Sequence, residues 1–369
     1  MQKPKIQAAM KKLRFNQRVA TFAVLLCAVT LTASAVEVKK EFHREMVPTD
    51  NTTLTVLNKF GSVVTETWSQ NNIVIDVTVK VEHSSAERAQ KLLDMIQVKF
   101  TEEGGNLRAE TVFNEDFSSI NWKGGSNTFS INYNVKMPAN INLDVTNKYG
   151  NTVIDEVSGL TNLAVKYGDL TVHKLSRGNT KPLNTIDIAY GKASADDLGW
   201  ADITARYCGQ FRIERASALL VDSKYSKVSV GEVSSLVAEA KYDGYVVTAA
   251  NNVVMMAGYT DISMGKVNKK LEIETKYGNL SVDVIPAEFN SISVKAGYCS
   301  VKLGINPSAC YTLKANSSYG SIKVDDANFS PTRRIAGNTS TELEGKVGKC
   351  SSPKSNVEVD ASYGSVKLY

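Results

Sequence analysis

One short pattern recurs along most of this chain: an alternating apolar segment, then Tyr-Gly, then a second alternating segment. Leu163 to Val172 shows the pattern in full, and Tyr277 to Val282 and Tyr319 to Val324 repeat its second half. Self-similarity of this kind restricts the fold strongly, because each unit must bury its apolar face against the next one. The marker aromatics stand mostly 17 or 18 residues apart; they are Tyr149, Tyr167, Tyr190, Tyr207, Tyr225, Tyr242, Tyr259, Tyr277, Tyr298, Tyr319 and Tyr363.

Apolar or small residues recur six, four and two positions before each marker tyrosine, and three, five and eight positions after it. Around Tyr225 these residues are Leu219, Val221, Ser223, Val228, Val230 and Val233. Two arrangements produce such a pattern. The Tyr-Gly pair could turn a hairpin in an antiparallel meander or barrel. Alternatively, each unit could be one coil of a β-solenoid whose strands pair with those of the next coil.

Three observations favour the solenoid. The units have nearly equal length, inward positions three apart occur twice per unit as expected at coil corners, and outward charges align when units are stacked. A basic column one residue before the aromatic then lies beside an acidic column three residues before it, which offsets like-charge repulsion. We predict an all-β, β-helix-like solenoid of about 17–18 residues per coil, right-handed by the general crossover rule. The same alternation predicts that the tyrosine rings turn inward into the core and do not form a sugar-stacking platform.

The first residues have the pattern of a secretory leader. Residues 1–35 contain a basic segment, an apolar run from Val19 to Thr30 and the small-residue site Ala33-Ser34-Ala35, as signal peptides do. The apolar run is short for a membrane span, and an uncleaved anchor is the alternative. We expect an exported protein of the periplasm, the outer-membrane surface or the extracellular space, with no transmembrane span after signal cleavage.

The rest of the chain divides into five expected segments. Residues 36–69 form a first coil, and residues 70–140 form a strand–helix–strand insertion, with Ser84 or Ser85 as the helix cap. Residues 141–326 are the β-solenoid repeats. Residues 327–356, where the pattern lapses, are expected to form a loop or cap. Residues 357–369 are expected to form a final coil with an open edge, and an edge of that kind invites self-association.

Charge and cysteine content limit the partners. The leader holds six of the 43 basic residues and none of the 38 acidic ones, so the remainder carries 37 basic against 38 acidic residues. A chain with this charge balance shows no excess of basic residues that would suggest binding to nucleic acid. Four cysteines follow the leader. We predict a disulfide between Cys310 and Cys350, which lie just before neighbouring units, whereas Cys208 and Cys299 lie five units apart and are too distant to bond.

The order of these segments resembles a known family. A leader, an early Phe60-Gly61 coil, an insertion ending in Met137-Pro138 and repeated Tyr-Gly strands are similar to the bacterial "putative adhesin" family of β-strand-repeat domains of unknown function. The Lys-Tyr-Gly units and the terminal Ser362-Tyr-Gly-Ser-Val-Lys-Leu368 resemble members from Bacteroidetes-type bacteria most. The resemblance covers roughly residues 50 to 369 and implies an extracytoplasmic β-solenoid. It brings no catalytic or ligand-binding residues with it.

No motif points to a specific reaction, metal or cofactor. The three histidines are scattered and form no ligand spacing, and nucleophile elbows and phosphate loops are absent from the sequence. Paired acids at Asp155-Glu156, Asp196-Asp197 and Asp325-Asp326 could serve glycoside chemistry, or they could simply be solvated corners. A column four residues after the aromatic is small and weakly polar and ends in Lys302, Lys323 and Lys367. This face could dock a polymer or another protein, or a neighbouring chain segment could cover it.

We therefore expect a non-enzymatic, exported, adhesin-like binding or scaffold protein of the bacterial cell envelope, without cofactors. The sequence does not identify the partner; a cell-surface glycan and an envelope protein are the candidates. The alternative is a polysaccharide-active β-helix enzyme that uses the corner carboxylates.

Overall fold

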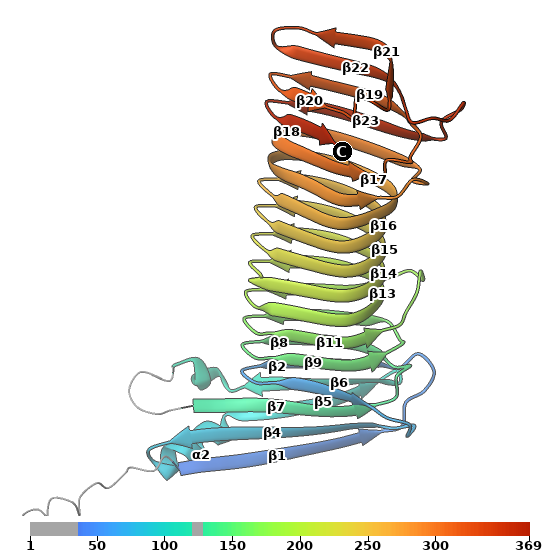
Figure 1. Ribbon diagram of the computed structural model, residues 1–369. Coiled ribbons are helices and arrows are strands. Elements are labelled where there is room, and N and C mark those ends of the chain that lie inside the picture. The colour runs from blue at the N-terminus through green and yellow to red at the C-terminus, as the bar shows by residue number, and fades with distance from the viewer. Residues whose placement is uncertain (1–35, 120–127) are drawn as a thin grey trace, which may run out of the picture.

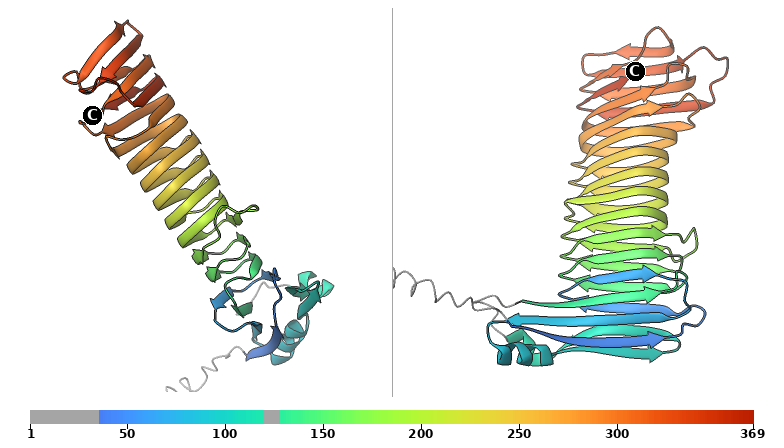
Figure 2. Two further views of the ribbon diagram at one scale, coloured as in Figure 1. Left: turned by 90° about the vertical axis from the view of Figure 1, so that its right-hand side faces the viewer. Right: turned by 60° about the horizontal axis from the view of Figure 1, so that its bottom comes forward.

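The computed structural model describes residues 36–119 and 128–369, so the expected leader lies outside the described residues. Within them the chain is mostly β-strand, with one α-helix and one short 3-10 helix. The all-β prediction is confirmed. Figures 1 and 2 show a long column of stacked strands standing on a wider N-terminal base.

The base consists of one antiparallel layer, one hairpin and the helices. β1 pairs with β4, and β4 pairs with β7, all antiparallel. β5 and β6 form the hairpin. The bounds are β1 (Val36–Met46), β4 (Ile73–His83), α2 (Ala86–Asp94), β5 (Ile96–Glu103), β6 (Asn106–Phe113), η1 (Glu115–Ser119) and β7 (Thr128–Met137).

Helix α2 is short because both of its ends are determined locally. The Ser85 hydroxyl accepts a hydrogen bond from the Arg88 backbone N–H, and the last helical residue, Asp94, is followed by the C-cap Met95. Ala89, Leu92 and Leu93 are its buried residues. The helix packs against β1 and β4, which gives the base its second layer.

The base joins the column through the first repeat unit, whose strands are β2 (Thr53–Lys59) and β3 (Val63–Thr67). β2 pairs in parallel with β6 on one side and with β8 on the other. β3 lies in the same way between β7 and β9. Strands β6 and β7 of the inserted segment therefore continue the stack below the first unit. Where β2 and β3 are paired, each has a neighbouring strand on both sides.

The column is built by parallel pairing of each unit with the next one. Lys224 pairs with Lys241, and Arg206 pairs with Lys224, so equivalent residues of successive units lie side by side. The strands are β8 (Asn142–Lys148), β9 (Thr152–Val157), β10 (Thr161–Lys166), β11 (Leu170–Leu175), β12 (Asn184–Ala189), β13 (Lys192–Arg206), β14 (Gln210–Lys224), β15 (Lys227–Lys241), β16 (Gly244–Gly258), β17 (Asp261–Ile285) and β18 (Ser291–Ile305).

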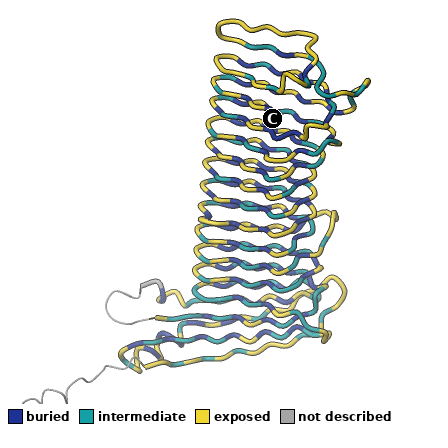
Figure 3. Tube along the Cα trace, viewed as in Figure 1, coloured by how far each residue is buried: buried dark blue, intermediate teal, exposed yellow. Residues whose placement is uncertain are grey.

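The core runs along the inside of the column. In β15 the side chains of Val228, Val230 and Val233 are buried, followed by those of Leu236, Ala238 and Ala240. These are the positions that the spacing around the tyrosines predicts, and Figure 3 shows the same alternation along the column. Fully burying one valine or leucine side chain stabilises a fold by about 1.5–3 kcal/mol, so repetition of this pattern is the main source of stability.

The C-terminal segment departs from the order of the sequence. Its strands are β19 (Tyr311–Ser318), β20 (Ser321–Lys323), β21 (Phe329–Ala336), β22 (Ser340–Val347), β23 (Ser355–Ser362) and β24 (Ser365–Leu368). β23 pairs in parallel with β18 and also with β19. The expected open edge at residues 357–369 is therefore wrong, because this segment inserts between two earlier units. In Figure 1 the chain ends beside β18, below the tip of the column.

The tip is formed by β21 and β22, where the sequence predicted a loop or cap. β22 pairs antiparallel with β19 and with β21, so the loop alternative is wrong for these two strands, which form a hairpin at the end of the stack, where a cap was the other alternative. The outermost strand, β21, carries Pro331, Arg333 and Arg334, and nearly all of its residues are exposed. Proline and charge on an edge strand hinder the addition of another chain.

Candidate functional site

A ridge of aromatic side chains runs along one corner of the column. We define the tyrosine ridge in its spatial order as Phe60, Tyr149, Tyr167, Tyr190, Tyr207, Tyr225, Tyr242, Tyr259, Tyr277, Tyr298, Tyr363 and Tyr319. The eleven tyrosines are 41–60% exposed, so the inward orientation predicted from alternation is wrong.

The backbone explains the outward orientation of the ridge. All twelve residues have a left-handed backbone, with φ between 53° and 63°. Such a residue interrupts the alternation of a strand, so the ring turns outward and the following residue turns inward. The signal available in the sequence was that following residue, which is almost always Gly or another small residue. A left-handed conformation costs about 1 kcal/mol for a residue with a Cβ.

The rings stack on one another without a break. Neighbouring centroids lie 4.6–5.1 Å apart, and the ring planes differ by only 2–17°. Each stacked pair contributes about 0.5–1.5 kcal/mol, which offsets the backbone cost. Because the ring faces cover each other, the ridge offers partners its ring edges and hydroxyl groups. It is not a platform on which sugar rings could stack face to face.

The residue after the aromatic makes two kinds of corner. At the glycine corners the backbone of the preceding unit comes very close: a Cβ on Gly168 would lie 2.0 Å from the Gly150 carbonyl oxygen. At the central corners a side chain occupies this place, and the residues are Cys208, Ser226, Asp243 and Thr260; Cys299, after Tyr298, is a further non-glycine residue at this place. Ser226 Oγ accepts from Cys208 N at 3.1 Å, and Thr260 Oγ1 accepts from Asp243 N at 3.2 Å.

Asp243 is the most constrained of these central residues. Its carboxylate accepts hydrogen bonds from Ser226 N at 2.6 Å, Lys241 N at 3.0 Å and Ser223 Oγ at 2.7 Å. Burial raises the pKa of this carboxyl, although the hydrogen bonds oppose the shift. The buried Tyr245 hydroxyl lies 2.6 Å from Ser223 Oγ, and burial raises the pKa of this tyrosine too. This network ties adjacent units together.

A basic column borders the ridge, one residue before the aromatic: Lys59, Lys148, Lys166, Arg206, Lys224, Lys241 and Lys276. Lys166 Nζ lies 5.4 Å from the Tyr167 centroid and 5.7 Å from that of Tyr190, within the range of a cation–π interaction. The acidic column beside it contains Asp222, which forms an ion pair with Arg206.

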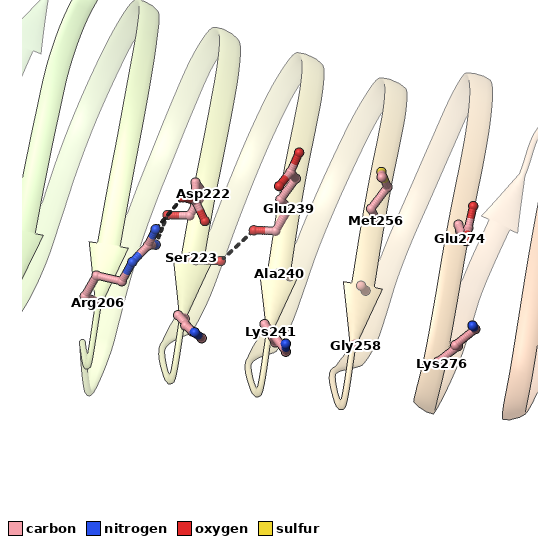
Figure 4. Close-up of a pocket in the computed structure, with 12 residues that line it drawn as sticks. Arg206, Asp222, Ser223, Glu239, Ala240, Lys241, Met256, Gly258, Glu274 and Lys276 are labelled. Carbon is pink, nitrogen blue, oxygen red and sulfur yellow. Dashed lines mark hydrogen bonds and ion pairs between the residues drawn. The ribbon is translucent and has the colours of Figure 1, made fainter.

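At the Tyr259 unit both columns lack their charged residue, although the units on either side carry both. Met256 stands in the acidic column and Gly258 in the basic column, and together with their neighbours they line a hollow of about 380 Å³. Figure 4 shows these two positions between the units that carry Glu239 with Lys241 and Glu274 with Lys276. A Cβ on Gly258 would meet no atom within 4 Å, so packing does not require glycine here.

The corner carboxylates are engaged separately. Glu156 binds Lys174 at 2.8 Å, Asp196 binds His173 at 2.9 Å, and Asp326 binds Arg334 at 3.0 Å. Asp155 accepts a hydrogen bond from Thr67 N. The structure thus gives these acids separate partners and does not gather them into one site. Across residues 36–119 and 128–369, no cluster of three or more His, Cys, Asp or Glu residues could hold a metal ion.

The cysteines are placed as follows. Cys310 and Cys350 form a disulfide with their Cα atoms 6.0 Å apart, next to the β21–β22 hairpin. Cys208 and Cys299 are free and buried, and burial raises the pKa of the Cys208 thiol. In the described part of the chain, no helix is long and apolar enough to cross a membrane.

No family model matches the sequence, and no curated protein matches it. Among solved structures, a putative adhesin from Parabacteroides distasonis ATCC 8503 matches at 10% identity and a TM-score of 0.32, over 89% of this chain and 97% of that one. A putative lipid binding protein from the same organism matches at 11% identity and 0.26, over 89% and 97%. A putative adhesin from Bacteroides fragilis NCTC 9343 matches at 9% identity and 0.24, over 89% and 97%.

Two of these neighbours carry the family name that the sequence resemblance implies. At TM-scores below 0.5, however, the likeness carries no argument about what this chain binds or does. The functional conclusion therefore rests on this chain's own residues.

Proposed function

We propose that this chain is an exported β-solenoid that acts as a non-enzymatic, adhesin-like binding or scaffold protein of the cell envelope, with the tyrosine ridge as its contact surface. The observation that carries the proposal is the unbroken stack of half-exposed rings along the whole column. The leader pattern in residues 1–35 supports export. The parallel pairing of each unit with the next supports the solenoid.

The chemistry of the ridge is suited to contact and offers nothing for turnover. Tyrosine combines a rigid apolar body with a hydroxyl, a combination that is enriched in protein interfaces. The hydroxyl edges and the lysines of the basic column repeat along one line, so a partner that also repeats can make the same contact many times. Several weak equal contacts on one rigid body give a high overall affinity.

The proposal is tested by binding of the purified protein to bacterial cells, to isolated peptidoglycan and to a glycan panel. The informative variant is the triple Tyr225→Phe, Tyr242→Phe and Tyr259→Phe. Phe60 occupies an equivalent ridge position with φ 63° and a stacked ring, so phenylalanine fits there. A matched control replaces the buried hydroxyl at Tyr245, which is 1% exposed.

We expect the triple variant to keep its melting temperature and to bind at least about tenfold more weakly, since three hydroxyl contacts of modest strength add up to that factor. The Tyr245→Phe control should bind as well as the unchanged protein. Absence of binding to all three targets would refute the adhesin-like function. If the triple variant bound as tightly as the unchanged protein, the ridge hydroxyls would not contribute to binding.

A further inference from the structure

Three units share a short motif that no other unit has. Each has serine two residues after the ridge tyrosine and lysine four residues after it, and the pairs are Ser300 with Lys302, Ser321 with Lys323, and Ser365 with Lys367. Elsewhere these two positions carry other combinations, such as Asn151 with Val153. The motif is local in each unit, but its three copies are far apart in the sequence.

The inserted C-terminal segment brings the three copies together. β24 lies between β18 and β20, so Lys367 pairs with Lys302 on one side and with Lys323 on the other. Ser365 pairs in the same way with Ser300 and Ser321. We call these six residues the serine–lysine ladder. It consists of a file of three lysines beside a file of three serines, at the strand spacing of about 4.8 Å.

The charges of the ladder are not balanced by its surroundings. All three lysines are exposed, and within the described residues none of them forms an ion pair. Lys367 Nζ lies 4.9 Å from the Tyr369 ring centroid. On the next unit, Ser281 pairs with Lys302 and Asn279 pairs with Ser300, so the adjoining positions are uncharged.

Two acids lie further along the strands. Asp325 follows Lys323 by two residues, and its two carboxylate oxygens accept hydrogen bonds from Ala327 N and Asn328 Nδ2. Asp283 stands two residues beyond Ser281, in an irregular stretch of the β17–β18 pairing. Like charges directly opposite each other destabilise a sheet, so the lysine file lowers the stability of the protein unless an anion binds it.

We propose that the serine–lysine ladder is a binding site for a linear anionic polysaccharide laid along the column axis. Ammonium and hydroxyl groups are donors toward sulfate or carboxylate oxygens, and lysine acts as a point charge that tolerates different approach angles. The donors form two straight files, which fits an extended chain with recurring negative groups. A lipid surface would need a broad plane of charge. This site is separate from the tyrosine ridge and does not depend on the function proposed for it.

The test uses dextran sulfate as the probe, with uncharged dextran and vesicles containing phosphatidylglycerol as comparisons. The ladder variant is the triple Lys302→Gln, Lys323→Gln and Lys367→Gln. The matched control is Lys136→Gln, Lys174→Gln and Lys270→Gln, which removes the same charge at lysines that form ion pairs with Glu66, Glu156 and Glu272. Thermal unfolding of both variants shows whether each is folded.

We expect the unchanged protein to bind dextran sulfate and not dextran, and the ladder variant to bind at least about tenfold more weakly because three charge-assisted contacts are lost. The slope of log Kd against log salt concentration should fall by about 2, the value for three charges on a single-stranded polyanion. The control should change affinity less than about twofold.

Three results would overturn the proposal. They are no binding of dextran sulfate, equal loss of affinity in both triple variants, and binding to the vesicles alone. A supporting arm replaces Ser300, Ser321 and Ser365 with alanine, which should weaken binding less than the lysine changes do and leave the salt slope unchanged.

Discussion

The two kinds of corner in the column carry an aromatic residue in the same left-handed backbone conformation. They differ in which side chain accepts a hydrogen bond from a backbone N–H of the adjacent unit. At the glycine corners an exposed side chain two residues after the aromatic accepts from the next unit, as Asn151 Oδ1 does from Asp169 N and Asp169 Oδ1 from Lys192 N. At the central corners a buried side chain one residue after the aromatic accepts from the preceding unit, as Asp243 Oδ1 does from Ser226 N.

The difference teaches where the units are free to vary. Glycine corners are fixed by the close approach of two backbones, so no side chain fits at those positions. Central corners have room for a side chain, and they fill it with hydrogen-bonded polar groups. In this central region Gly244 and Gly258 lie where a Cβ would meet no atom within 4 Å. Neither has a positive φ, so neither glycine is required by packing or by backbone conformation.

The largest expected effect is at a glycine corner. Gly168→Ala places a Cβ 2.0 Å from the Gly150 carbonyl oxygen, and the two backbones must separate. We expect a loss of about 3 kcal/mol in the free energy of unfolding, measured by urea denaturation. A loss below about 0.5 kcal/mol, the range of ordinary surface changes, would show that the corners do not pack as closely as described.

At a central corner, Asp243→Ala removes one carboxylate and leaves buried donors unpaired. We expect a loss of about 2 kcal/mol, the cost of unsatisfied buried polar groups. Burial raises the pKa of the Asp243 carboxyl from 3.8, so the folded protein holds this proton more tightly than the unfolded chain. Stability should therefore fall as pH rises from about 3.8 through the raised pKa. Asp243→Asn should lack this pH dependence. If the free energy of unfolding of this variant changed with pH as it does in the unchanged protein, a group other than Asp243 would be responsible.

Two changes at Tyr225 separate the contribution of ring stacking to stability from the cost of the left-handed backbone. Tyr225→Ala loses both ring contacts and keeps the strain, so we expect a loss of about 1.5 kcal/mol. Tyr225→Gly loses the same contacts and relieves the left-handed strain, so it should be about 1 kcal/mol more stable than the alanine variant. If the alanine variant were the more stable of the two, φ at this position would not be positive.

The smallest expected effect is the counterpart of the first. Gly244→Ala adds a methyl group in open space at a residue without positive φ. It should stabilise the protein by about 0.5 kcal/mol, because alanine reduces the freedom of the unfolded chain. The difference between this variant and Gly168→Ala measures the contrast between a glycine in close contact with the neighbouring backbone and a glycine in open space. Similar destabilisation by both changes would erase that contrast.

Much of the column could be predicted from the sequence because burial repeats at fixed positions. Val228, Val230 and Val233 are buried as expected. The orientation of the ring could not be read from alternation, since one left-handed residue reverses it. The small residue after each tyrosine is the signal for that reversal.

The place of the C-terminal segment could not be predicted either. The motif at Tyr363 identifies it as a repeat unit, but spacing along the chain does not give its order in the stack. For that reason the sequence led us to expect a free edge at residues 357–369. The side-by-side register of Lys302, Lys367 and Lys323 follows only from the insertion of the C-terminal segment between earlier strands.

The outward tyrosine ridge is the central claim, and chemical footprinting tests it most directly. Brief nitration of the folded protein followed by mass spectrometry reports which of the 15 tyrosines are accessible. We predict modification at the eleven ridge tyrosines and protection of Tyr133 and Tyr245, which are 0% and 1% exposed. Protection of the ridge tyrosines to the same degree as Tyr245 would contradict the account.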